Sequence, residues 1–224
     1  MSAQEQVKAA QLEAAHALSK LLTQQGILHA FIGGFGIRLL GATRPTEDID
    51  VMIDVGDTRE IFDRIRPLLQ KQDARFSVEG LKLYFTSEAN QQVRVNVETL
   101  AAGTLGLPPH ITAFSPENQD LPVLQPSILI LTKIKRWAML SESTRPRSII
   151  KAQRDLEDIG YLLYWLAQHK ENIDFVRYES THPERLFDAV RQLVHIGKRD
   201  SWVDLLELLV SVLTEEDLAK VKDA

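Results

Sequence analysis

The sequence predicts an α+β protein in which a mixed sheet flanked by helices is followed by a C-terminal helical bundle. Three observations support this prediction. Short apolar, strand-like runs alternate with helical patterns before about residue 101. After residue 126 the apolar residues recur almost entirely at helical spacing. Between the two halves lies a loop-like segment in which prolines concentrate: Pro108, Pro109, Pro116, Pro122 and Pro126. We therefore expect two domains, residues 1–120 and 121–224.

The first half contains the strand signals. Apolar residues at helical spacing predict a helix over residues 5–25, which ends before Gly26. A short helix at 35–40 is stopped by Gly41, and a third at 58–72 has Asp57 as its N-cap. Short apolar or alternating runs predict strands, and Glu79-Gly80 predicts a hairpin within them. The expected strands are 27–32, 49–55, 76–78, 81–86 and 93–97.

The second half is predicted to be helical throughout. We assign no regular structure to residues 101–125, because their prolines and glycines interrupt any period. The apolar pattern then predicts helices at 127–141, 148–169, 183–196, 201–212 and 215–222.

Composition excludes several classes of site. The 224 residues include 26 Lys+Arg, 31 Asp+Glu and no cysteine, for a net charge of −5. A disulfide scaffold, a cysteine-ligated zinc or iron–sulfur site and a cysteine nucleophile are therefore excluded. The six histidines show no ligand spacing, so we expect no zinc site. We also expect a cytoplasmic protein, since no run approaches the ~18 apolar residues of a membrane helix and the first twenty residues do not resemble a signal peptide.

The informative motif begins at Gly33-Gly34, between an expected strand and an expected helix. Glycine lets the backbone approach a ligand closely, and a helix N-terminus presents free N–H groups and the positive end of its dipole. This arrangement predicts a phosphate-binding turn. The alternative is a simple tight turn without a ligand.

Asp48 and Asp50 follow on the next expected strand. Because strand side chains alternate, both carboxylates emerge on one face while Ile49 and Val51 point into the core. Adjacent carboxylates are costly unless a cation neutralises them, and Mg²⁺ prefers carboxylate and phosphate oxygens. A phosphate-binding turn beside such a pair predicts phosphoryl or nucleotidyl transfer. The alternative for Asp48 is a cap of a turn.

The order Gly33-Gly34, Arg44, Thr46 and Asp48-Ile49-Asp50 resembles the signature of the nucleotidyltransferase superfamily, which includes DNA polymerase beta, aminoglycoside nucleotidyltransferases and AbiEii-type toxins. The resemblance implies an NTP bound at Gly33, Gly34, Arg44 and Thr46. It also implies two Mg²⁺ ions held by Asp48 and Asp50. A nucleoside monophosphate would then pass to a hydroxyl of a tRNA, a protein or a small molecule, with release of pyrophosphate. We expect a toxin-like enzyme, with oligomeric state open.

That family uses a third carboxylate on a later strand. In the run from Val93 to Thr99, the side chains of Arg94, Asn96 and Glu98 share the face opposite the valines. The family pattern places the third acid at Asn96, which cannot act as a base, and we favour Glu98 as its substitute. This departure leaves an alternative function open: a catalytically degenerate member that binds nucleotide, RNA or a partner protein.

A basic cluster marks the second half. Residues 133–154 contain one acid, Glu142, and seven basic side chains: Lys133, Lys135, Arg136, Arg145, Arg147, Lys151 and Arg154. The segment resembles AbiEii-like proteins, which implies that Lys133 contacts the triphosphate and that Lys151, Asp155 or Asp158 supports the site. The alternatives are a solvated basic face or an RNA-binding surface.

Overall fold

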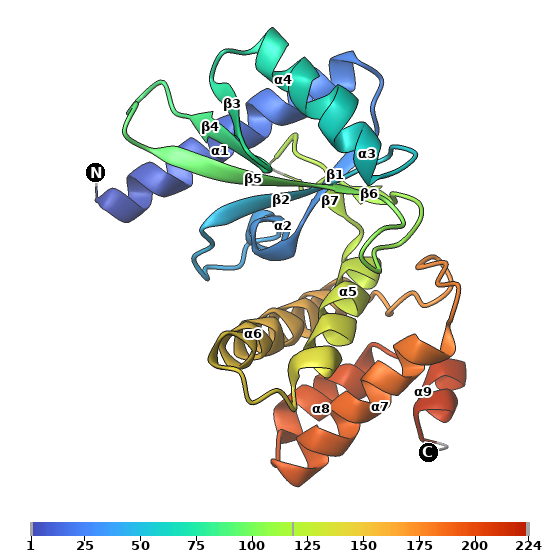
Figure 1. Ribbon diagram of the computed structural model, residues 1–224. Coiled ribbons are helices and arrows are strands. Elements are labelled where there is room, and N and C mark those ends of the chain that lie inside the picture. The colour runs from blue at the N-terminus through green and yellow to red at the C-terminus, as the bar shows by residue number, and fades with distance from the viewer. Residues whose placement is uncertain (1, 118, 223–224) are drawn as a thin grey trace. The chain divides into compact units, whose positions relative to one another are not determined.

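The computed structural model describes residues 2–117 and 119–222, and the chain divides into two units, Met1–Leu124 and Gln125–Ala224. The division falls after Leu124, where the sequence analysis placed it after residue 120. The unit with the sheet precedes the helical unit along the chain (Figure 1). We describe each unit by itself.

The first unit is built on a seven-stranded mixed sheet of order β3-β4-β5-β2-β1-β7-β6. Its central pair, β2 with β5, is parallel, whereas β1 with β2 and β4 with β5 are antiparallel. This confirms the predicted α+β class. The strands are β1 (His29–Ile32), β2 (Asp48–Ile53), β3 (Phe76–Glu79), β4 (Lys82–Thr86), β5 (Arg94–Ala101), β6 (Ala113–Phe114) and β7 (Val123–Leu124).

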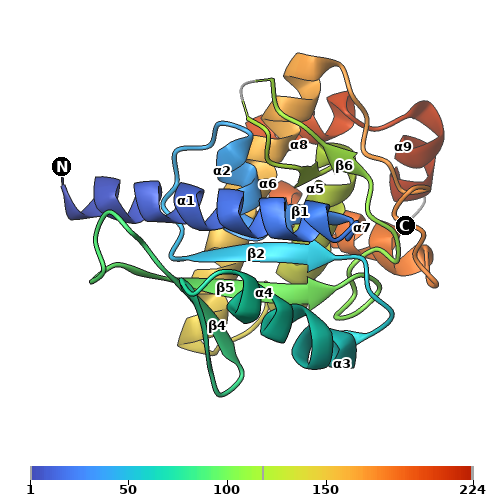
Figure 2. The ribbon, with the colours of Figure 1, turned by 90° about the horizontal axis from the view of Figure 1, so that it is seen from above.

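Helices cover both faces of this sheet. Figures 1 and 2 show α1 and α4 on one face, and Figure 1 shows α2 on the other. The predicted helix over residues 58–72 is continuous but contains a π-helical middle segment, and Asp57 caps it as predicted. The helical elements are α1 (Ala3–Gln24), α2 (Gly33–Leu39), α3 (Thr58–Glu60), η1 (Ile61–Ile65) and α4 (Arg66–Gln72).

Two short strands lie in the segment that we predicted to be irregular. β6 and β7 span two residues each, and the backbone N–H of Phe31 donates to the carbonyl of Pro122 at 2.7 Å. A two-residue strand is too short to show alternation, so periodicity could not reveal it. The prediction of irregular structure was therefore wrong at these four positions.

The second unit is helical, as predicted. Pro126 and Pro146 occupy the first helical positions of α5 and α6. A backbone N–H at this position has no partner within the helix, so proline loses no hydrogen bond there. The two helices therefore begin one and two residues earlier than predicted. The helices are α5 (Pro126–Leu140), α6 (Pro146–His169), α7 (Glu184–Arg199), α8 (Val203–Ser211) and α9 (Glu215–Lys222). Within the described parts of both units, every helix is too short or too polar to span a bilayer.

A buried histidine ties α1 to β1. The His29 ring lies 3.1 Å (Nδ1) from the Ile27 carbonyl and 2.9 Å (Nε2) from Ser19 Oγ, and its side chain is almost completely buried. A carbonyl can only accept, so Nδ1 donates and the neutral ring accepts at Nε2 from the Ser19 hydroxyl. Burial lowers the pKa of His29 below its ordinary value of 6.5, and the bond to Ile27 opposes this shift.

We predict that His29 makes the first unit sensitive to acid. Below about pH 6.5 the unfolded chain binds a proton that folded His29 does not, so the free energy of unfolding falls as the pH drops toward the folded pKa. Above that pH the contribution is constant. Urea unfolding at about pH 7.5 and about pH 5.5 measures the difference. His29→Gln should reduce this pH dependence, whereas His182→Gln at an exposed position should leave it unchanged. Equal pH dependence in wild type and His29→Gln would contradict the assignment.

Candidate active site

The central strand pair brings three carboxylates together. In the parallel register of β2 and β5, Asp48 lies opposite Asn96 and Asp50 lies opposite Glu98. Carboxylate oxygens of Asp48, Asp50 and Glu98 all lie within 4.8 Å of one another. The two aspartates are half-buried and Glu98 is exposed. We call this group the acid cluster.

The turn between β1 and α2 packs directly against this cluster. Gly33 has a φ of +64°, and a Cβ built on it would lie 1.8 Å from Oδ2 of Asp50. Only glycine combines that backbone conformation with so close an approach. Of the two glycines, Gly33 has the positive φ and Gly34 does not.

The loop before β2 completes the turn's surroundings. A Cβ on Gly34 would lie 2.9 Å from both Arg44 Nη2 and Thr46 Oγ1. The Thr46 hydroxyl donates to Asp48 Oδ1 at 3.2 Å, and Arg44 Nη1 donates to the Pro45 carbonyl at 3.1 Å. The structure thus brings together Gly33, Gly34, Arg44 and Thr46 with the acid cluster.

Two polar residues that the sequence analysis missed support this loop, Gln11 from α1 and Arg38 from α2. Gln11 is fully buried; its Nε2 donates to the Thr46 carbonyl at 3.0 Å, and its Oε1 accepts from Arg38 Nη1. Burial lowers the pKa of Arg38, whose guanidinium lies 4.9 Å from the Phe35 ring centroid. The available signal was a glutamine on the otherwise alanine-rich buried stripe of α1.

A third missed residue lies beside Glu98. Arg66 is buried; its Nε donates to Thr99 Oγ1 at 3.0 Å, and its guanidinium stacks 4.3 Å from the Phe62 ring centroid. Burial lowers the pKa of Arg66, and the negative charge of Glu98 opposes this shift. Arg66 therefore adds a nearby positive charge to the electrostatics of Glu98.

The remaining predicted site residues belong to the second unit. Lys133 is 1% exposed, and its Nζ lies 2.7 Å from Asp158 Oδ2 and 3.5 Å from Asp155 Oδ1. Asp155 also accepts from Arg136 Nε at 2.7 Å and from Arg136 Nη2. Lys151 is exposed on α6. Lys133 therefore links α5 to α6 through two buried carboxylates.

Comparison with known proteins agrees with this geometry. Residues 17–191 match the family model described as "Nucleotidyl transferase AbiEii toxin, Type IV TA system". The chain belongs to this AbiEii family. It is therefore a nucleotidyltransferase, which confirms the resemblance stated from the motif. No curated protein sequence matches the chain at a significant level.

Two solved structures are similar to this chain to different degrees. An antigenic nucleotidyltransferase-like protein from Paracoccidioides brasiliensis is 18% identical, with 92% of this chain and 94% of that chain covered and a TM-score of 0.65. The antibiotic-resistance factor ANT(2'')-Ia is 12% identical in its solution structure, with 72% and 92% covered and a TM-score of 0.42. The first likeness shows that this AbiEii-family chain has a nucleotidyltransferase-like fold, and the second is too weak to add to it.

We predict that Gly33→Ala disrupts the acid cluster as well as the turn. An L-residue with left-handed φ costs about 1–2 kcal/mol, and the new Cβ would also displace the Asp50 carboxylate. Gly80→Ala is the matched control, because Gly80 has a φ of +60° and an added Cβ meets nothing within 4 Å. Urea unfolding should show a larger loss for Gly33→Ala than for Gly80→Ala. Equal losses would contradict close packing of Asp50 on Gly33.

We predict that Lys133→Met destabilises the second unit by about 3–5 kcal/mol, since it leaves two buried carboxylates without their lysine. Lys151→Met, at an exposed position of α6, should stay within about 0.5 kcal/mol of wild type. Denaturant unfolding measures both. If the two variants are equally stable, the ion pairs of Lys133 with Asp155 and Asp158 do not hold α5 to α6.

Proposed function

We propose that this AbiEii-family enzyme uses Mg²⁺ to transfer a nucleoside monophosphate from an NTP to an acceptor hydroxyl, with release of pyrophosphate. The observation that carries the proposal is the convergence of three carboxylates, within 4.8 Å, on the glycine turn. A cluster of like charges beside the N-terminus of α2 suits a ligand that brings both phosphates and cations.

The donor set fits a hard divalent cation. Carboxylate oxygens are the protein ligands that Mg²⁺ prefers, and substrate phosphates supply others. We assign Asp48 and Asp50 as the residues that would hold two ions. Bound there, the ions would supply Lewis acidity toward the phosphates and neutralise the acid cluster.

The surrounding residues bind and orient the nucleotide in this proposal. The backbone at Gly33 and Gly34 contacts the phosphates, and Arg44 supplies a positive charge next to that turn. Thr46 orients Asp48 through its hydroxyl. Lys133 is assigned a structural role between α5 and α6, and its contact with nucleotide stays a prediction, as does support from Lys151 and Asp155.

The chemistry requires a proton acceptor. The hydroxyl oxygen of the acceptor substrate attacks the α-phosphorus of the NTP, and the bond from that phosphorus to the pyrophosphate oxygen breaks. The proton of the attacking hydroxyl must then pass to another group. We assign Glu98 as the group that accepts this proton, because its carboxylate belongs to the acid cluster and lies one step along β5 from Asn96 on the same face.

The acceptor class stays open between RNA, protein and small molecule. The family's description as a toxin favours a toxin-like role, and a cytoplasmic location stays a prediction. The alternative is a degenerate member that binds nucleotide, RNA or a partner protein without transfer, and Asn96 at the family's third-acid position is the observation that favours it.

The experiment that tests the proposal is incubation with labelled NTPs, Mg²⁺ and cell extract, to identify the molecule that acquires the label. Asp48→Asn and Asp50→Asn should abolish labelling and pyrophosphate release without loss of stability, because each substitution removes a charge from a repulsive cluster. Asp54→Asn, an exposed aspartate directly after β2, is the control and should keep full activity. Wild-type activity in either cluster variant would refute the metal site.

A separate prediction distinguishes the two candidates on β5. Glu98→Gln should slow transfer by roughly 10²–10⁴-fold with NTP binding retained, as expected for loss of a positioned base. Asn96→Asp tests the alternative, because it restores the family's acid. A silent Glu98→Gln together with a gain in Asn96→Asp would move the base to position 96, and no change in either would favour the binding-only alternative. Single-turnover rates and calorimetric NTP affinity are the measurements.

A further inference from the structure

A cavity of about 240 Å³ lies among α7, α8 and α9, within the second unit and separate from the residues of the proposed function. One face of α7 lines it through Arg191, Val194, His195 and Lys198, which recur at helical spacing. The same three helices are neighbours in Figure 1. The cavity therefore belongs to the fold of this bundle and does not depend on a single loop.

The floor of the cavity is apolar. It is formed mainly by α8 and α9 and the turn between them, through Leu206, Leu209, Val210, Leu213, Leu218 and Val221. Leu209 is fully buried, whereas Val210 remains 49% exposed. Apolar surface thus stays open to solvent in the lining of a concave site, where burial by a ligand would be favourable.

The rim of the cavity is basic. Its cationic or titratable side chains come from α7 and α9, and none of the eleven described lining residues is acidic. Arg191 is already engaged: Nε and Nη2 donate to the Lys220 carbonyl at 3.0 and 2.7 Å, and Nη1 donates to Asp188 at 2.8 Å. Arg191 therefore holds α9 against α7.

Three basic groups of the rim remain available to a ligand. His195, Lys198 and Lys222 are exposed and form no ion pair or side-chain hydrogen bond with any described residue. An apolar floor under such a rim is complementary to an amphiphile with an anionic head.

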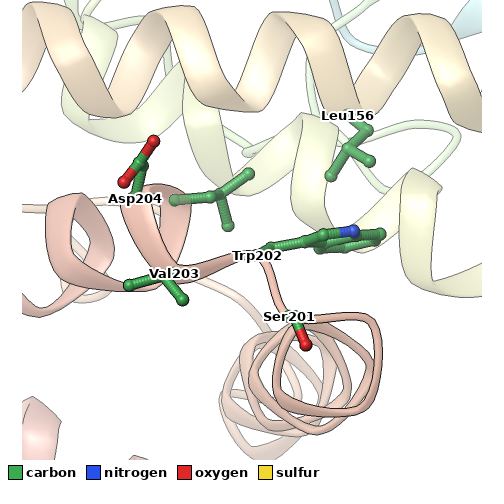
Figure 3. A pocket seen from close by; sticks show the side chains of 6 residues that line it. Leu156, Ser201, Trp202, Val203 and Asp204 are labelled. Atoms are coloured by element: carbon green, nitrogen blue, oxygen red, sulfur yellow. The ribbon is translucent and has the colours of Figure 1, made fainter.

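A second hollow in this unit has a different character. It measures about 390 Å³ and is lined by Leu156 and residues 201–205, with the Trp202 indole and Leu156 side chain facing it (Figure 3). Among its described lining residues, Asp204 is charged and none is basic. Trp202 also packs edge-on against Trp137, with ring centroids 6.2 Å apart. The described lining of this hollow therefore offers no ligand chemistry comparable to that of the α7–α9 cavity.

We propose that the α7–α9 cavity binds a medium-chain alkyl carboxylate. At the roughly 30 Å³ that one water occupies in the liquid, a cavity of about 240 Å³ holds about eight waters, and we take an alkyl chain of about eight carbons as the ligand of comparable size. A helix of a partner protein is about 10–12 Å in diameter with its side chains, and a cavity of about 240 Å³ is too small to hold even one or two turns of it. The alkyl chain covers Val210 and its neighbours while the carboxylate lies between Lys198 and Lys222.

Calorimetric titration of the full chain with octanoate tests the proposal, with octylamine as the probe of opposite charge and hexanoate as the shorter one. Octanoate should bind at least tenfold more tightly than octylamine, and hexanoate more weakly than octanoate because less apolar surface is buried. Thermal unfolding should shift upward with octanoate. No binding of octanoate, or equal binding of octanoate and octylamine, overturns the proposal.

Matched variants locate the site. Val210→Trp fills the cavity from an exposed position and should weaken octanoate binding more than tenfold. Val176 is 85% exposed in the loop between α6 and α7, and Val176→Trp should leave octanoate binding unchanged. The double variant Lys198→Gln/Lys222→Gln changes only exposed rim charges and should weaken binding roughly twofold to thirtyfold. Unchanged affinity in either cavity variant overturns the proposal, and the rim variant decides the matter if Val210→Trp fails to fold.

Discussion

The register of β2 against β5 is the constraint on which the active site depends. Ile49, Val51, Val95 and Val97 are buried on one side of these strands. A slip of either strand by one residue would turn its two buried side chains out and its acids in. The hydrophobic core therefore enforces the pairing that sets Asp48 opposite Asn96 and Asp50 opposite Glu98. The apolar alternation that stabilises the sheet thus also positions the face that carries the acid cluster. A substitution that shifts this register would damage fold and activity together.

This pairing forces like charges together, and the surrounding residues moderate the repulsion without removing it. The Thr46 hydroxyl donates to Asp48, and Arg66 contributes positive charge near Glu98 from beneath the strands. The three carboxylates still lie within 4.8 Å of one another. A hard divalent cation prefers such oxygen ligands, and this preference is the basis of the metal site proposed above. Gly33 is needed because Asp50 fills the space that any side chain there would occupy.

Most of the fold and the central residues of the site could be predicted from the sequence, because local signals carry them. Strand alternation placed Asp48, Asp50 and Glu98 on one face, and the strand–glycine–helix order placed the turn next to them. The contributions of Gln11 and Arg66 could not be predicted, because each depends on contacts between residues far apart in the chain: Gln11 with Thr46, and Arg66 with Thr99. Single-sequence patterns report the face of an element but not its partner. The two-residue strands β6 and β7 escaped prediction for a related reason, since their pairing is set by neighbours rather than by a period.

The basic segment shows how charge in a sequence differs from charge on a surface. Read along the chain, residues 133–154 form a single run of positive charge. In the structure, Lys133 and Arg136 are paired with carboxylates that follow on α6, and Lys133 is buried. Arg136 is partly exposed, and the exposed charges follow later, at Arg145, Arg147 and Lys151 around the start of α6. Lys133 and Arg136 thus act in holding α5 to α6, and any attraction of phosphate or nucleic acid by this segment must come from the exposed part. Because salt screens exposed charges much more than buried or partly buried pairs, ionic strength separates these two roles experimentally.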